Sequence, residues 1–155
     1  MEKIKKLKKI LIREKLDGYL IPKNDEFFGE YISEYNDRLN FISNFTGSYG
    51  FAIMLRNKNY LFVDGRYSLQ AKNQSGNNFN IITFPNKIPR DIFKEKKISI
   101  GYDPCLFTKN FFDIFFKKTN IKFLPLKENL IDKIWRRKKL IKIKKFYVLP
   151  KKFSN

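Results

Sequence analysis

The chain has 155 residues, of which 33 are Lys or Arg, 15 are Asp or Glu, one is Cys and none is His. A chain of this length with 43% hydrophobic residues is expected to form one globular domain rather than two, and not an intrinsically disordered protein. The single Cys excludes an internal disulfide framework. The absence of His excludes a Cys/His zinc site and any mechanism in which an imidazole acts as base or metal ligand.

The basic residues are concentrated at the two ends of the chain. Residues 1–15 carry seven basic and two acidic side chains, and residues 133–155 carry ten basic and no acidic side chains. The stretch between them is nearly balanced, with sixteen basic and thirteen acidic side chains. Lys outnumbers Arg by 26 to 7, whereas nucleic-acid readers favour the planar guanidinium of Arg. We therefore expect weak, non-specific binding to polyanions but no specific nucleic-acid site.

The first predicted helix covers residues 3–15, and its apolar positions Ile4, Leu7 and Leu11 have helical spacing. This pattern favours a surface helix packed on a sheet over a helix lying in a membrane interface. No apolar run is long enough to span a bilayer, and the N-terminus lacks the apolar core of a signal peptide. The cytoplasm, with no membrane partner, is therefore the expected location.

Further elements follow in chain order. A short buried strand is expected at 19–21 and ends at Pro22; one or two helical turns are expected at 25–31, with Asn24 or Asp25 as N-cap. A helix at 39–45 and a tight turn at 47–50 lead into two strands, 51–55 and 60–63, joined by a hairpin turn. The remaining predicted elements are a helix at 66–73, a strand at 79–84, a helix at 91–96, a strand at 98–101, a helix from Thr108 to about 118, a strand at 121–124 and a helical turn at 129–135.

Strands that alternate with helices predict a three-layer α/β/α domain in which one hairpin makes the sheet mixed. The aromatic stripe of the helix after Thr108, formed by Phe111, Phe112, Phe115 and Phe116, is typical of a helix buried against a sheet rather than of a base-stacking surface.

Four stretches, in this order, resemble one family. They are Tyr35 to Ser48, which contains Arg38 and Phe45-Thr46-Gly47-Ser48; Leu61 to Tyr67, which contains Asp64-Gly65-Arg66-Tyr67; Ile100 to Pro104; and Asn129 to Trp135. They are similar to the N-terminal, creatinase-like domain of the Xaa-Pro aminopeptidases. The chain departs from the family pattern at Asn44 and Tyr49, and it has Lys138-Lys139 where an Arg-Pro pair is expected.

The resemblance implies a ribonuclease H-like α/β fold over residues 1–137, with 138–155 as a basic tail similar to the linker into a catalytic domain. In this family a separate pita-bread domain removes an N-terminal residue that precedes proline, and it holds a pair of metal ions, usually manganese. The resemblance therefore implies a non-catalytic domain, natural or truncated, that has no cofactor of its own. Its implied role is to help shape the substrate entrance and the contacts with a catalytic domain or with other copies in an oligomer.

The candidate residues for the substrate entrance or an interface are Arg38, Asp64, Arg66 and Tyr67, and Phe45, Thr46, Gly47, Ser48 and Gly65 are the structural motif. A cation at a helix start is unfavourable, so Arg66 needs a partner, which is either Asp64 or a substrate carboxylate. Arg38 is either an interdomain or intersubunit contact or a surface partner of Asp37 or Glu34.

The carboxylates Asp37, Asp64 and Asp103 could in principle bind a hard cation, although ordinary turn chemistry explains them better. No catalytic and no metal-binding residue is therefore expected in the chain.

A second hypothesis is a stand-alone basic module that binds nucleic acid or an acidic protein. It is favoured if the Lys residues between 140 and 153 form one face with Arg136 and Arg137. The first hypothesis is favoured if this segment packs as a strand or meets a further domain.

Overall fold

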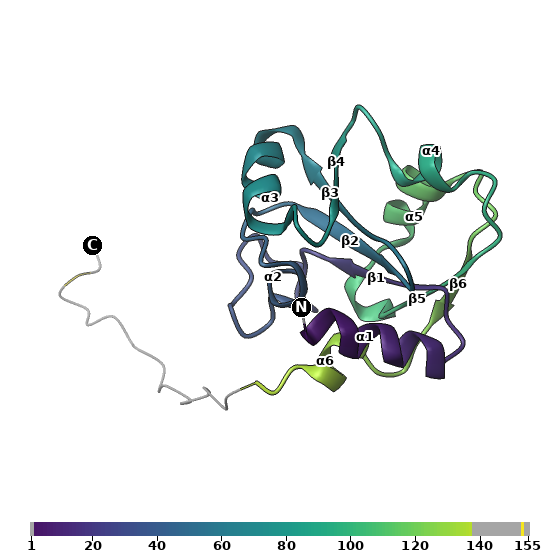
Figure 1. Ribbon diagram of the computed structural model, residues 1–155. Coiled ribbons are helices and arrows are strands. Elements are labelled where there is room, and N and C mark those ends of the chain that lie inside the picture. The colour runs from purple at the N-terminus through teal and green to yellow at the C-terminus, as the bar shows by residue number, and fades with distance from the viewer. Residues whose placement is uncertain (1, 138–152, 154–155) are drawn as a thin grey trace.

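The computed structural model describes residues 2–137 and residue 153, and the fold within them is a mixed sheet between two layers of helices (Figure 1). The six strands are β1 (Gly18–Pro22), β2 (Gly50–Leu55), β3 (Asn59–Asp64), β4 (Asn80–Phe84), β5 (Ser99–Tyr102) and β6 (Lys122–Pro125). The helices are α1 (Glu2–Arg13), α2 (Arg38–Ser43), α3 (Ser68–Ser75), α4 (Pro89–Phe93), α5 (Lys109–Phe116) and α6 (Leu130–Ile134), with short 3-10 turns at Gly65–Tyr67 and Pro104–Leu106.

The strand order is β4-β3-β2-β1-β5-β6. The strand β2 pairs antiparallel with both β1 and β3, whereas the other neighbouring pairs are parallel. Five strands therefore end at the same edge of the sheet, and β2 begins there. This arrangement confirms the predicted mixed sheet with one hairpin.

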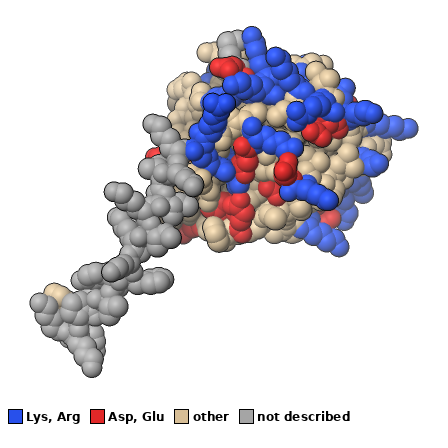
Figure 2. Space-filling model, turned by 90° about the horizontal axis from the view of Figure 1, so that it is seen from below, with Lys and Arg blue, Asp and Glu red and all other residues tan. Residues whose placement is uncertain are grey.

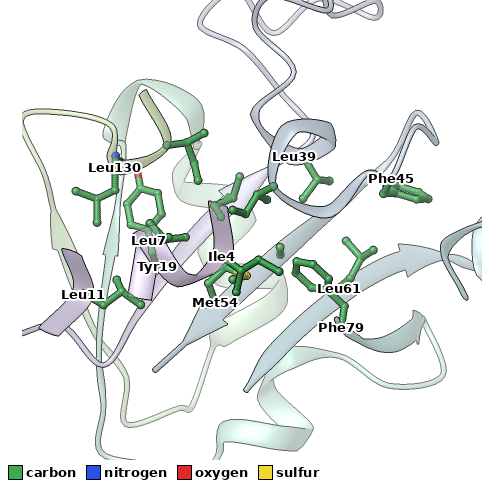
Figure 3. Close-up of a cluster of buried hydrophobic side chains, with 14 of the residues drawn as sticks. Ile4, Leu7, Leu11, Tyr19, Leu39, Phe45, Met54, Leu61, Phe79 and Leu130 are labelled. Atoms are coloured by element: carbon green, nitrogen blue, oxygen red, sulfur yellow. Dashed lines mark hydrogen bonds between the residues drawn. The ribbon is translucent and has the colours of Figure 1, made fainter. Parts of the chain in front are cut away.

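One face of the sheet is covered by α1, α2, α3 and α6. The apolar stripe of α1 contributes Ile4, Leu7, Ile10 and Leu11 to a buried cluster that also contains Tyr19 and Met54 of the strands. Figure 3 shows Ile4, Leu7 and Leu11 in this cluster. The buried Tyr19 hydroxyl accepts a hydrogen bond from the Leu130 amide, at 3.3 Å, and so joins β1 to α6. The predicted packing of α1 on the sheet is confirmed.

The other face is covered by α4 and α5, and its core is largely aromatic. Phe115 and Phe116 of α5 are buried beside Phe51 and Phe62 of the central strands. Thr108 caps α5 as predicted, because its hydroxyl accepts a hydrogen bond from the Phe111 amide. The three-layer α/β/α prediction is therefore correct.

The helical turns predicted at 25–31 are wrong. The Asp25 carboxylate accepts a hydrogen bond from the Phe27 amide, which forms a local turn, and Phe28 has a left-handed backbone with φ of 53°. A side chain that satisfies the backbone locally competes with a helix, so this stretch forms a loop instead. In addition, α2 ends at Ser43 rather than at residue 45, because Asn44 is left-handed with φ of 64°.

Among the described residues, none of the helices has the length and apolarity needed to cross a membrane. Figure 2 shows that basic side chains spread over the face seen from below, and that acidic side chains gather in part of it.

Candidate functional site

A surface cleft of about 750 Å³ lies at the edge of the sheet where the parallel strands end. Its lining includes Pro22 and Lys23 after β1, Arg66 after β3, Leu106 and Phe107 after β5, and the residues that begin β2. The carboxyl edge of an open α/β sheet is the usual position of a ligand site in such folds. This cleft is therefore the candidate functional site.

Three of the four candidate residues are gathered beside this cleft. The Asp64 carboxylate accepts hydrogen bonds from the backbone N–H of Arg66, at 3.0 Å, and from its Nε, at 2.9 Å. The guanidinium also lies over the Tyr67 ring, 5.6 Å from its centre. The predicted Arg66–Asp64 pair is thus present.

The pair changes the titration of both groups. The side-chain hydrogen bond from Arg66 lowers the pKa of Asp64, with a further contribution from the Arg66 backbone N–H, and the same pair raises the pKa of Arg66. The Arg66 side chain is 74% exposed, and its two amino groups form no hydrogen bond with any described residue. They are available to an incoming carbonyl or carboxylate group.

The motif from Phe45 to Ser48 supports this corner of the cleft. Phe45 is fully buried and its ring meets that of Tyr67 edge-on at 6.0 Å, while the Ser48 hydroxyl lies 2.7 Å from the Tyr67 hydroxyl. The Thr46 hydroxyl accepts hydrogen bonds from two Gln side chains of α3, both at 2.9 Å. A Cβ on Gly47 would lie 2.3 Å from the Phe45 ring, so this close approach requires glycine.

Arg38 lies elsewhere, and neither of its predicted surface partners is correct. Asp37 pairs with Lys23 instead, and Glu34 is exposed and forms no ion pair within residues 2–137. Arg38 is 4% exposed and donates two parallel hydrogen bonds of 2.9 Å to Asp132 of α6.

A third hydrogen bond, of 2.6 Å, joins Arg38 to Glu26. Burial opposes the charge of Arg38, but the hydrogen bonds with Asp132 and Glu26 outweigh it, so the pKa of Arg38 is raised.

The arginines Arg38 and Arg137 both bind the Asp132 carboxylate. The Arg137 guanidinium also lies over the rings of Trp135 and Tyr35, at 4.6 and 5.1 Å. Arg38 and Arg137 therefore hold α6 against the loop formed by residues 23–37. This loop connects these arginines to the cleft, because Phe28 to Ile32 line the cleft.

Most of the residues that line the cleft were not predicted as site residues from the sequence. Loop 23–37 contributes Phe28, Glu30 and Tyr31, and the turn before β2 contributes Tyr49. The available signal was composition: this stretch has four aromatic residues and five acidic residues against one Lys, in a chain with a net charge of +18.

The carboxylates Asp37, Asp64 and Asp103 do not converge. Each accepts a backbone hydrogen bond at the start of a different element, namely α2 and the two 3-10 turns. In the part of the chain that the structure describes, no group of three or more acidic, Cys or His residues is placed to hold a metal ion.

Comparison with known proteins agrees with this architecture. Residues 3–134 match the family model of the creatinase/prolidase N-terminal domain. A probable Xaa-Pro aminopeptidase P of Coprinopsis cinerea is 31% identical over 83% of this chain. Xaa-Pro aminopeptidase 1 of Dictyostelium discoideum is 32% identical over 86% of it. The chain spans only about 22–23% of the length of these two relatives.

Two solved structures share the fold of this chain. The cytosolic X-prolyl aminopeptidase of Caenorhabditis elegans, described as having a di-nuclear active site, superposes with a TM-score of 0.75 and 28% identity. The match covers 86% of this chain and 25% of that one. The N-terminal domain of the peptidase PepQ from Mycobacterium tuberculosis has the same fold over 98% of its length, with a TM-score of 0.65 and 18% identity. Taken with the family match over residues 3–134, these similarities show that the chain belongs to the creatinase/prolidase N-terminal domain family.

Proposed function

We propose that this chain acts as the non-catalytic N-terminal domain of an Xaa-Pro aminopeptidase-like metallopeptidase. In this role residues 1–137 form the domain, and residues 138–155 lead towards a catalytic domain. The observation that carries the proposal is the match of residues 3–134 to a domain that makes up about 22% of a named aminopeptidase.

Hydrolysis is assigned to the remainder of such a protein. The carboxylates of this chain that were candidate metal ligands are engaged in separate turns, and the sequence has no His. A two-metal hydrolase needs carboxylates that converge on ions about 3.5–4 Å apart. Manganese, where it is needed, would therefore be held by the catalytic domain.

The cleft is suited to form part of a peptide entrance. Its floor is aromatic, and Arg66 at its side has donors that no described residue uses. A guanidinium donates well to peptide carbonyl and carboxylate oxygens. We assign Arg66 to binding of the peptide, and Asp64 and Tyr67 to holding Arg66 in place.

The surface around loop 23–37 and α6 is suited to contact a further domain or another copy of the chain. Phe27 and Tyr31 are 82% and 87% exposed, and the ion pairs of Arg38 fix this loop to α6. Large exposed aromatic residues on one surface commonly mark an interaction site. Arg38 then positions this surface without itself facing the partner.

The test is a chimera in which this chain replaces the matching segment of the Caenorhabditis elegans enzyme, assayed on an Xaa-Pro peptide with manganese. The isolated chain should show no turnover under the same conditions. In the chimera, Arg66→Ala should raise KM about tenfold with little change in kcat, because an interaction that binds the ground state and the transition state equally affects KM.

The matched control is Arg13→Ala, which removes another exposed Arg that is paired with a neighbouring carboxylate. It should leave KM unchanged. Normal kinetics in the Arg66→Ala chimera would show that Arg66 does not bind the peptide. Metal-dependent turnover by the repurified isolated chain would contradict the assignment of hydrolysis to the catalytic domain.

A further inference from the structure

We propose that the cleft binds a cationic polypeptide segment, whose Lys or Arg side chain lies among the aromatic residues of loop 23–37 beside Glu30. This inference deepens the proposed function, on which it rests, by naming the class of peptide that the cleft takes.

The first observation is the aromatic content of the cleft. Phe51, Phe107, Phe111 and Phe115 form its floor, with ring centres of neighbouring pairs 4.9–5.1 Å apart. The walls add Phe28, Tyr31 and Tyr49, which are 49%, 87% and 49% exposed. The faces of aromatic rings attract organic cations.

The second observation is the state of the charged residues in the lining. They are Lys23, Glu30 and Arg66. Lys23 is neutralised by Asp37 and Arg66 by Asp64. Glu30 is exposed and forms no ion pair with any residue of the described range 2–137. After internal pairing, the lining therefore keeps one unpaired negative charge.

The surroundings of Glu30 add to this charge. Loop 23–37 carries five acidic residues and one Lys, and its exposed Glu34 also has no ion pair within residues 2–137. The rest of the chain is strongly basic. A cation is thus attracted to this loop and repelled by most of the remaining surface, which gives the site its selectivity.

The size of the cleft agrees with a peptide rather than a small ion. A volume of about 750 Å³ lies within the range of about 300–1,000 Å³ that is usual for ligand pockets. It can hold several residues, so the apolar parts of the peptide can contact the aromatic floor while a cationic group meets Glu30.

The test measures binding of a fluorescein-labelled octapeptide of alternating Lys and Leu to the full chain by fluorescence anisotropy. The ionic strength is 0.15 M, which limits charge effects to about 8 Å. The same peptide with acetylated lysines is the comparison ligand. We expect the lysine peptide to bind about tenfold more tightly than the acetylated one.

Each variant replaces an exposed side chain, so the urea midpoint of unfolding should stay unchanged. Measuring this midpoint confirms that each variant is folded. Glu30→Gln should weaken binding of the lysine peptide about threefold, Glu30→Lys about tenfold and Tyr31→Ala about fivefold. Glu95→Lys makes the same charge change at an exposed position that does not line the cleft, and it should have no effect.

Equal affinity for the two peptides, or binding that Glu30→Lys leaves unchanged, would overturn the inference. If Tyr31→Ala weakened both peptides equally, the cleft would bind peptides without selecting charge, and the proposed function would stand. Binding of neither peptide would also overturn the inference, while the kinetics of the chimera decide the proposed function separately.

Discussion

Replacement of Arg38 by Ala is expected to lower the free energy of unfolding, because it removes the cation of a buried ion pair. Arg38 is 4% exposed and makes three hydrogen bonds to the carboxylates of Asp132 and Glu26. Removing one partner from a buried ion pair costs about 3–5 kcal/mol. The two carboxylates are 31% and 40% exposed, so water replaces part of what they lose. We therefore expect a loss of about 2–3 kcal/mol in the free energy of unfolding.

This loss can be measured by urea unfolding followed by circular dichroism, and it corresponds to a decrease in Tm of about 5–10 °C. The single Trp of the chain, Trp135, stacks on Phe41 at 4.7 Å and lies next to Arg137. Its fluorescence therefore reports on the α6 region directly and should change in the folded Arg38→Ala variant.

Two matched substitutions test the reasoning. Arg38→Lys keeps the charge but cannot form the two parallel hydrogen bonds with Asp132, so an intermediate loss of about 1–2 kcal/mol is expected. Arg13→Ala removes an exposed arginine and should change stability by less than about 0.5 kcal/mol. If Arg38→Ala lost less than about 1 kcal/mol, or if Arg38→Lys matched the original chain, the ion-pair argument would be refuted.

Three further outcomes are expected. Gly47→Ala should cost about 1–3 kcal/mol in urea unfolding because its Cβ meets the Phe45 ring, whereas Gly65→Ala, with nothing nearer than 3.7 Å, should stay within about 0.5 kcal/mol; equal losses would contradict the packing argument. Burial opposes ionisation of Glu26, but the hydrogen bond from Arg38 outweighs it and lowers the pKa of Glu26; this contribution to stability is present above the ordinary pKa of about 4.5 and is lost as the pH falls through the lower folded-state value. As the pH is lowered from 6 to 3, the urea midpoint of the Glu26→Gln variant should therefore fall less steeply than that of the original chain. An unchanged slope would contradict this role of Glu26. Binding to DNA should be indifferent to sequence and collapse between about 50 and 200 mM salt, and a sequence preference that persists at the higher salt would favour the basic-module hypothesis.

Local patterns predicted the layers of the fold well. The spacing of Ile4, Leu7 and Leu11 identified the buried face of α1, and Thr108 was correctly placed as the cap of α5. These features depend on residues within one or two turns of each other. Periodicity and capping are therefore sufficient to predict them.

Interactions between distant residues were not predictable in the same way. Arg38 and Asp132 are 94 positions apart, and a charge pattern gives no information on which of several carboxylates an arginine will bind. Two nearer carboxylates, Asp37 and Glu34, were the partners predicted for the alternative in which Arg38 forms a surface ion pair, and neither is correct. The cleft was missed for the same reason, because its lining comes from several loops that meet only once the sheet has formed.

The position of Arg137 bears on the choice between the aminopeptidase-domain hypothesis and the basic-module hypothesis. A basic face would need Arg137 to point into solvent together with Arg136, but the Arg137 side chain is 17% exposed and engaged by Asp132. The residues from 138 to 152 and 154 to 155 lie outside the described part, so the predicted role of that tail stays a prediction.

Two of the four stretches that carried the family resemblance, residues 35–48 and residues 61–67, are in contact with each other in the fold. The Phe45 ring and the Ser48 hydroxyl both meet Tyr67, and Thr46 is bound by two side chains of α3, the helix that follows Tyr67. Tyr67 in turn lies beneath the guanidinium of Arg66. These two stretches thus form one packed unit whose outer member is Arg66, at the side of the cleft. Arg66 contacts Asp64 and Tyr67 and its side chain is 74% exposed, so its own ion pair adds little to stability, because water screens exposed charges. The proposed role of Arg66 therefore depends on the donors that this side chain presents to the cleft, and the kinetics of the Arg66→Ala chimera test it.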